Sequence, residues 1–133
     1  MTVAERLAAA PWYGWPIGSA VCVDGCTDVL RVVGYQHLRH RRGRQLRLRS
    51  VRGLAEITMS TGSCVPVLDD YATAALLLAR LWEHDTGWHT HDDEPPGYVA
   101  HISPASQWRA PTRGEALALA ALECLQNEPP APR

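Results

Sequence analysis

Between residues 19 and 67, short runs of aliphatic and β-branched residues alternate with polar positions, and glycines punctuate the gaps between the runs. Alternation with a period of two is typical of strands that bury one face, and glycine favours the turns that join them. The pattern therefore predicts a small five-stranded, barrel-like antiparallel β-meander. The expected strands are residues 19–23, 29–39, 44–51, 55–60 and 64–67.

Three other segments have the apolar spacing and the start signals of helices. Thr2 with Glu5, and Thr112 with Glu115, form capping boxes whose side chains satisfy backbone N–H groups at a helix start. An Asp-Asp pair at residues 69–70 caps the remaining segment, which lies between the other two in the sequence. The expected helices are residues 3–10, 71–84 and 113–126, and the middle one has an apolar stripe at Ala74, Leu77, Leu78, Leu81 and Trp82.

The segment after the middle helix predicts strands again. Residues 88–91 and 97–103 have strand character and flank a polar, proline-containing loop, and residues 107–110 are a candidate third strand. The last expected helix is apolar nearly all round its circumference. It is therefore expected either to be sandwiched inside the chain or to form a homodimer through residues 112–126.

These elements predict an α+β protein with four consecutive parts. Residues 1–18 form an N-terminal helix and an aromatic turn, and residues 12–16 of that turn are expected to cover one end of the core. Residues 19–68 form an SH3-like β-meander, and residues 69–127 an α-β-β-α unit. The proline-rich residues 128–133 are expected to be a disordered tail.

Charge is distributed unevenly along the chain. The 133 residues carry a formal net charge of −1, yet residues 31–52 contain eight arginines and no Asp or Glu. If Gly43 closes a three-residue hairpin loop in a left-handed conformation, Leu38 pairs with Leu46. The period of two then places leucines 38, 46 and 48 in the core, and arginines 39, 47 and 49 on the opposite face with Tyr35 and His37.

An arginine-rich sheet face with interleaved aromatic residues suits phosphate contacts and base stacking. The alternative is a solvated charged face that prevents edge-to-edge strand pairing, and a third reading of the same surface is a site for an acidic protein. The candidate binding residues are Tyr35, His37, Arg39, Arg41, Arg42, Arg44, Arg47, Arg49 and Arg52.

The histidines and cysteines carry weaker signals. His89 and His91 are two residues apart on an expected strand and share a face, but simple hairpin pairing places His101 on the other face. A solvated polar hairpin is favoured over a metal site for the set His84, His89, His91, Asp92, Asp93 and His101. Cys22 and Cys26 lack a second pair at zinc-finger spacing, so they, like Cys64 and Cys124, are expected to be reduced core residues.

The sequence contains no nucleophile elbow, phosphate-binding glycine loop or zinc-protease motif, so we expect neither an enzyme nor a bound cofactor. The start of the chain lacks the charged and apolar regions of a secretory signal, and no apolar run has the length of a membrane span. The expected compartment is the cytoplasm, without a membrane partner.

The C-terminal half resembles the phage ABA sandwich family, which is found in bacteriophage and prophage genomes. The similarity spans roughly residues 68–126 and rests on Asp-Tyr-Ala-Thr at 70–73, Ala75, Leu78, Pro-Thr-Arg-Gly-Glu-Ala at 111–116 and Ala-Ala-Leu at 120–122. The long N-terminal half and the histidine hairpin depart from the family pattern. The resemblance implies a phage accessory protein in a bacterial host and implies no mechanism.

Together these observations predict a non-enzymatic phage or prophage accessory protein that binds nucleic acid or a nucleoprotein through its arginine face. An alternative is a host-defence inhibitor of the anti-CRISPR type, which would dock on a protein effector. A metal-dependent hydrolase that uses the histidine hairpin is a third alternative.

Overall fold

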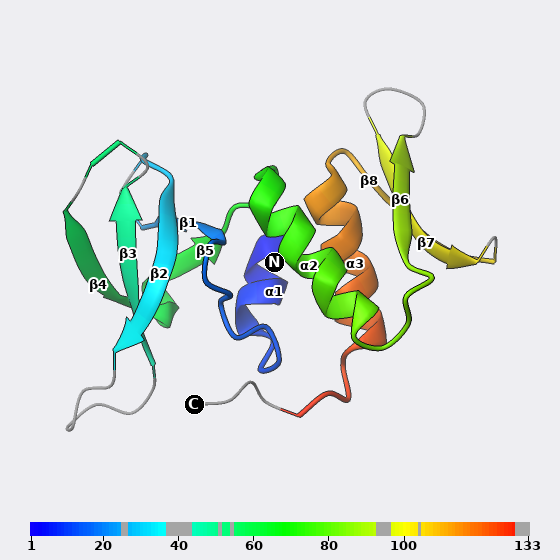
Figure 1. Ribbon diagram of the computed structural model, residues 1–133, viewed down its shortest axis with the longest axis horizontal. Coiled ribbons are helices and arrows are strands. Elements are labelled where there is room, and N and C mark those ends of the chain that lie inside the picture. The colour runs from blue at the N-terminus through cyan, green and yellow to red at the C-terminus, as the bar shows by residue number, and fades with distance from the viewer. Residues whose placement is uncertain are drawn as a thin grey trace.

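The computed structural model describes residues 1–24, 27–36, 44–50, 52–53, 55–92, 97–103 and 105–129. These residues form an α+β fold with three α-helices and two antiparallel sheets (Figure 1). The helices are α1 (Val3–Ala9), α2 (Tyr71–Trp82) and α3 (Arg113–Cys124), and a short 3₁₀ helix covers Thr61–Ser63. The strands are β1 (Ala20–Val23), β2 (Leu30–Gln36), β3 (Gln45–Ser50), β4 (Glu56–Ser60), β5 (Cys64–Pro66), β6 (His89–Asp92), β7 (Tyr98–Ser103) and β8 (Ser106–Ala110).

All five strands expected in the first half are present and make one sheet with the order β4-β3-β2-β1-β5. Strands β1 to β4 form a meander, and β5 pairs with β1 at the far edge. In the described part of the chain, β4 and β5 remain two separate edges. Closure into a barrel is therefore not observed, and the barrel-like description is not confirmed.

The expected register between β2 and β3 is wrong, although the faces assigned to β3 are right. Leu46 pairs with Tyr35, not with Leu38, and one extra residue, Val33, makes a bulge in β2. Leu46 is fully buried whereas Arg47 on the next position is exposed, as the alternation predicts. Leu38 and Gly43 lie outside the described residues, so the left-handed glycine stays a prediction.

Each helix begins at a capping residue that was expected from the sequence. The Thr2 hydroxyl accepts a hydrogen bond from the Glu5 N–H at 3.1 Å, and the Thr112 hydroxyl accepts one from the Glu115 N–H at 3.2 Å. The Asp70 carboxylate caps α2 by accepting from the Thr73 N–H at 2.9 Å. These bonds satisfy N–H groups that have no partner inside the helix.

Replacing Thr112 with alanine is expected to lower the free energy of unfolding by about 1 kcal/mol, because the Glu115 N–H loses its acceptor. Denaturant unfolding of the Thr112→Ala and Thr112→Ser variants measures this effect. Serine keeps the hydroxyl and is expected to stay close to wild type. Equal loss of stability in both variants would contradict the capping role.

The C-terminal unit has three strands, so the expected α-β-β-α arrangement is corrected to α-β-β-β-α. Strand β8 pairs with β7 in the order β6-β7-β8. Helix α3 lies between this sheet on one side and α1 and α2 on the other (Figure 1). Its residues Ala116, Leu117, Ala118, Ala120 and Ala121 are fully buried. The helix is therefore sandwiched inside the chain, and these residues are not available for the homodimer that was its alternative.

The aromatic turn before β1 covers the core as expected. Trp12, Tyr13 and Trp15 are each at most 6 % exposed. Gly14 and Trp15 adopt left-handed backbone conformations with φ of 69° and 51°. Such a φ is strained for tryptophan, so neighbouring contacts must hold the turn in place. Burial raises the pKa of the Tyr13 hydroxyl to about 12, and the Ser19 hydroxyl partly offsets this effect.

Glu128, which follows α3, contacts the end of α2 and the residues just after it. Glu128 contacts both Arg80, at 3.4 Å, and His84, and its side chain is 17 % exposed. The expected disordered tail therefore does not begin at residue 128, and residues 130–133 lie outside the described part of the chain.

Among the helices that the structure describes, none combines the length and the apolar character that a membrane crossing requires.

Candidate functional site

Two arginines on the outer face of β3 share one carboxylate from β4. Arg47 donates from Nε at 3.2 Å and from Nη2 at 2.9 Å to one oxygen of Glu56. Arg49 donates from Nη2 at 2.7 Å to the other oxygen. The strand register explains the arrangement, because Arg49 pairs directly with Glu56 and Arg47 is two positions away on the same face.

Residues 31–52 contain no acid, but β4 supplies Glu56 from outside that run. The two arginines hold the pKa of that carboxyl below its usual value, Arg47 having the larger effect. One carboxylate nevertheless leaves a pair of guanidiniums with an excess positive charge. Within the described residues, Nη1 of Arg47 and both Nε and Nη1 of Arg49 make no hydrogen bond. We call Arg47, Arg49 and Glu56 the arginine face.

A glycine on β2 makes room for one of these guanidiniums. Gly34 pairs with Arg47, and a β-carbon at Gly34 would lie 3.2 Å from Arg47 Nη1. The Arg47 side chain therefore occupies the space next to β2 that a side chain at residue 34 would need. Next to it, Arg31 pairs with Arg49 across the sheet, so that Arg31, Arg49 and Glu56 form a row over three strands.

Arg31 itself has a structural role. It binds both carboxylate oxygens of Asp70, at 2.7 and 3.0 Å, and the Gly18 carbonyl at 3.0 Å. This ion pair joins β2 to the first turn of α2 and lowers the pKa of Asp70, whose charge also caps that helix. Both terminal nitrogens of Arg31 therefore bond within the fold, whereas Arg47 and Arg49, among the described arginines on the outer face of this sheet, bond to Glu56 alone.

Tyr35 and Arg44 do not belong to the arginine face, contrary to expectation. The Tyr35 hydroxyl donates to the Trp15 carbonyl at 2.6 Å, and Arg44 donates to the Gly14 carbonyl at 3.0 Å. The Arg44 guanidinium carbon lies 3.8 Å from the centre of the Tyr35 ring. Both side chains therefore turn to the core side of the sheet and hold the strained aromatic turn.

The remaining candidate residues lie either in the turn after β3 or outside the described part of the chain. Arg52 is exposed in the turn after β3. His37, Arg39, Arg41 and Arg42 lie outside the described residues, in the connection from β2 to β3.

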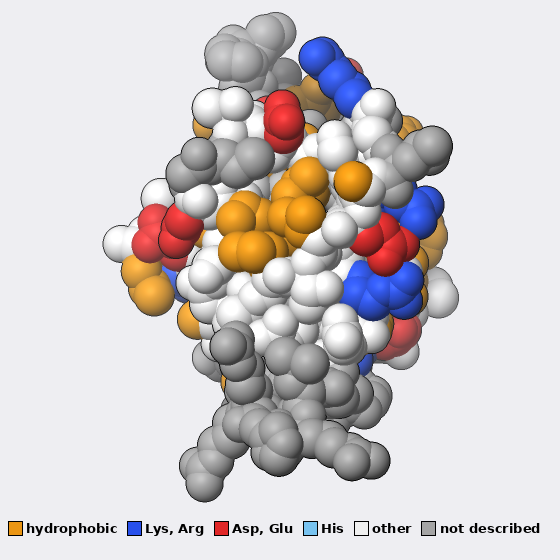
Figure 2. All heavy atoms as spheres, turned by 90° about the vertical axis from the view of Figure 1, so that its left-hand side faces the viewer, with side chains coloured by type: hydrophobic (Ala, Val, Ile, Leu, Met, Phe, Trp, Pro, Cys, Tyr) orange, Lys and Arg blue, Asp and Glu red, His pale blue; other side chains and the backbone are white. Residues whose placement is uncertain are grey.

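Figure 2 looks onto the five-stranded sheet end of the molecule, where acidic and basic side chains lie next to each other beside a hydrophobic patch. Sequence reasoning missed Glu56, because strand register, not spacing along the chain, brings it to Arg47 and Arg49.

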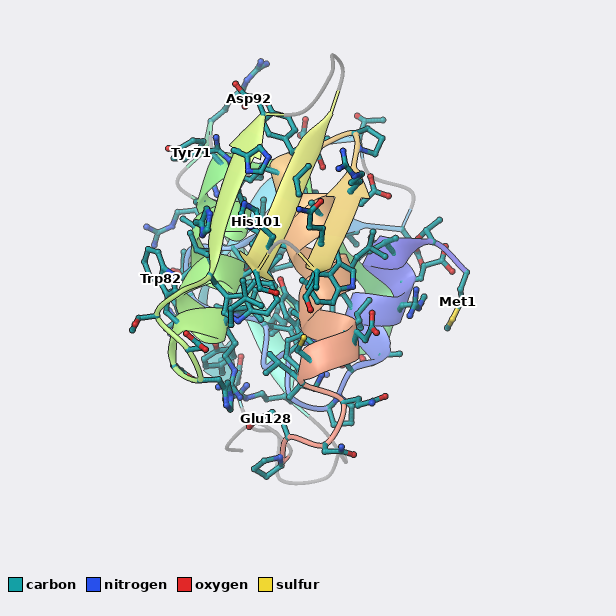
Figure 3. All side chains as sticks on the ribbon, turned by 90° about the vertical axis from the view of Figure 1, so that its right-hand side faces the viewer. Met1, Tyr71, Trp82, Asp92, His101 and Glu128 are labelled. Carbon is teal, nitrogen blue, oxygen red and sulfur yellow. The ribbon has the colours of Figure 1, made fainter. Side chains whose placement is uncertain are left out.

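The histidines of the second sheet form a compact cluster, which corrects the expected position of His101. His101 pairs directly with His89 and therefore shares its face. Its Nε2 lies 2.9 Å from Nδ1 of His91, and its ring centre lies 3.9 Å from that of His89. Figure 3 shows His101 on the face of this sheet turned away from the helices.

The cluster predicts a pH-dependent stability. Burial, followed by the charges of His89 and His91, lowers the pKa of His101 below 6.5. The folded protein therefore binds a proton at His101 less readily than the unfolded chain does. The contribution of neutral His101 to stability is complete above pH 6.5, and it is lost as the pH falls through the pKa of the folded state. NMR titration of the imidazole signals is expected to give a His101 midpoint below 6.5, and His101→Gln to weaken the loss of stability in acid. A His101 midpoint above 6.5 would contradict this geometry.

The cluster does not have the arrangement of a metal centre. Among the residues that the structure describes, no group of three or more His, Cys, Asp or Glu side chains could hold a metal ion. His84 lies elsewhere and contacts Glu128. Cys22, Cys64 and Cys124 are free thiols, and Cys26 lies outside the described residues. Cys124 is exposed, so it is not the core residue that the sequence predicted, whereas Cys64 is buried.

No family model matches the chain, and neither a curated protein nor a solved structure matches it. The resemblance of residues 68–126 to the phage ABA sandwich family therefore stays a prediction.

Proposed function

We propose that the protein is a non-enzymatic binding protein and that its arginine face contacts the phosphate backbone of a nucleic acid. The observation that carries this proposal is that Arg47 and Arg49 share the single carboxylate of Glu56. Shared pairing holds two guanidiniums side by side, with 44 % and 45 % of their side chains exposed, and leaves donors free for phosphate oxygens. The phage accessory class, acting in the bacterial cytoplasm, fits this proposal.

The position of the arginines in the sheet supports binding over edge protection. Charges that prevent edge-to-edge pairing belong on an edge strand. Arg47 and Arg49 lie on β3, which has hydrogen-bonded neighbours on both sides, β2 and β4. These two arginines therefore protect no edge. Surface ion pairs also contribute only about 0–1 kcal/mol to stability, so the arrangement is not explained by stability alone.

Removing the shared carboxylate is the experiment that tests the proposal. Glu56→Gln removes a negative charge that competes with phosphate and keeps a side chain of the same shape. We expect this variant to bind a fluorescent single-stranded oligonucleotide several-fold more tightly than wild type, because the arginine face gains one unit of positive charge. Fluorescence anisotropy at fixed ionic strength measures the affinity.

Glu123→Gln is the matched control. It changes the net charge equally, and the Trp108 indole, which donates to Glu123 at 2.7 Å, keeps an oxygen acceptor. It is expected to bind like wild type. Equal gains in both variants would mean that only net charge matters, and no gain in either would refute the arginine face as the site.

A further inference from the structure

A cavity of about 560 Å³ lies where the first turns of α2 and α3 meet the ends of β6 and β7. Neither Arg47, Arg49 nor Glu56 lines it. Its size is within the range of about 300–1,000 Å³ that is common for small-molecule sites. Figure 3 shows the region from the side of the second sheet, with Tyr71 and Asp92 labelled. The cavity is therefore separate from the arginine face and requires its own explanation.

Charges of both signs line this cavity without pairing. Arg113 begins α3, Asp69 precedes α2 and Asp92 ends β6. In the part of the chain that the structure describes, none of these three side chains makes an ion pair or a hydrogen bond. Asp70 also lines the cavity, but Arg31 and the first turn of α2 already occupy its oxygens. Unpaired opposite charges around one cavity indicate a ligand that carries both.

Two tyrosines hold the guanidinium in place. The Arg113 guanidinium carbon lies 5.7 Å from the ring centre of Tyr71 and 5.5 Å from that of Tyr98. Its Nε is buried and has no acceptor among the described residues. Because Nε itself is enclosed, a ligand in the cavity would bind Arg113 through the two terminal nitrogens of the guanidinium. A carboxylate is the group that a planar guanidinium binds best, through two parallel hydrogen bonds.

We propose that this cavity binds a free α-amino acid with an apolar side chain. The α-carboxylate binds Arg113, and the α-ammonium group binds Asp92 and Asp69. The apolar side chain packs against Tyr71, which is 77 % exposed, and against Tyr98. A simple anion would leave both carboxylates uncompensated and close to its own charge, and a simple cation would face Arg113. A zwitterion satisfies both signs at once.

The test is isothermal titration of the whole protein with L-phenylalanine and L-leucine. N-acetyl-L-phenylalanine, which lacks the ammonium group, and phenethylamine, which lacks the carboxylate, are the ligand controls. We expect the two amino acids to bind and each control to bind at least tenfold more weakly. Arg113→Gln and Asp92→Asn are each expected to weaken amino-acid binding at least tenfold, and Arg113→Lys to weaken it less than Arg113→Gln.

Arg6→Gln is the matched protein control, because Arg6 is exposed on α1 and does not line the cavity. It is expected to bind like wild type, and thermal unfolding verifies that each variant is folded. Absence of binding by both amino acids, or equal binding of N-acetyl-L-phenylalanine, would overturn the proposal. So would amino-acid binding that survives in folded Arg113→Gln. None of these three results would bear on the arginine face, since the titration contains no nucleic acid.

Discussion

Replacing Gly114 with alanine is expected to destabilise the protein by about 3 kcal/mol or more and to lower its melting temperature by on the order of 10 °C. Gly114 is in the first turn of α3 and is packed against the backbone that precedes α2. A β-carbon there would overlap the carbonyl oxygen of Leu68 and lie 2.9 Å from its carbonyl carbon. Backbone cannot rotate away as a side chain can, so α3 would have to move within its sandwich.

Whether Gly114→Ala lowers or raises stability shows whether α3 lies against the Leu68 backbone. In a helix without such a contact, alanine is more favourable than glycine by about 1 kcal/mol, so Gly114→Ala would stabilise the protein. Gly62→Ala is the control, because a β-carbon at Gly62 would meet its nearest neighbour, Ser60 Oγ, at 3.8 Å. Thermal unfolding of both variants is the measurement. A Gly114→Ala protein as stable as wild type would mean that α3 does not lie this close to Leu68.

Replacing both arginines of the arginine face with glutamine is expected to weaken oligonucleotide binding by on the order of 100-fold, because two phosphate contacts are lost together. The folded state is expected to survive, since exposed ion pairs contribute about 0–1 kcal/mol. Glutamine is preferable to a charge reversal, because glutamates at Arg47 and Arg49 would place three carboxylates side by side with Glu56. Like charges directly opposite each other destabilise a sheet.

Arg80→Gln is the matched control for the loss of an arginine. Arg80 pairs with Glu83 and Glu128 at the C-terminal end of α2, outside the five-stranded sheet. It is expected to bind within about twofold of wild type. Far-UV circular dichroism shows whether the double variant is folded. A folded double variant that binds like wild type would refute the role of these two arginines.

Local sequence signals predicted much of the fold because they act over short distances. The hydroxyls of Thr2 and Thr112 and the carboxylate of Asp70 cap helices within three residues of themselves. The faces assigned to Leu46 and Arg47 are correct even though the hairpin register from which they were derived is wrong, because the alternation of leucine and arginine along β3 holds in either register. Such preferences do not depend on which strand lies alongside, so they can be read before the fold is known.

Features that depend on register could not be predicted in the same way. The extra residue at Val33 and the actual pairing of Leu46 put Tyr35 on the core side, because an odd shift in register exchanges the two faces of a strand. The pairing of His89 with His101 likewise depends on the length of a loop whose conformation the sequence does not specify. Glu56 reaches the arginines only through the β3–β4 pairing.

The cavity beside Arg113 combines three separate parts of the chain, and no short motif marks it. Its charged residues are spread from Asp69 to Arg113 and come together only when α2, α3 and the second sheet are packed. The sequence signal that was available was the capping box at Thr112, which located the start of α3 but gave no indication of Tyr71 or Tyr98 beside it.

The salt dependence of oligonucleotide affinity tests the arginine face most directly. Plotting the logarithm of the association constant against the logarithm of salt concentration, from about 50 to 200 mM, counts the phosphate charges that the protein neutralises. We expect wild type to give a negative slope, and the double glutamine variant a slope shallower by about 1.4, which is about 0.7 for each lost contact with a single strand. Equal slopes for the two proteins, or no measurable wild-type binding at the lowest salt, would contradict the proposal that Arg47 and Arg49 bind phosphate.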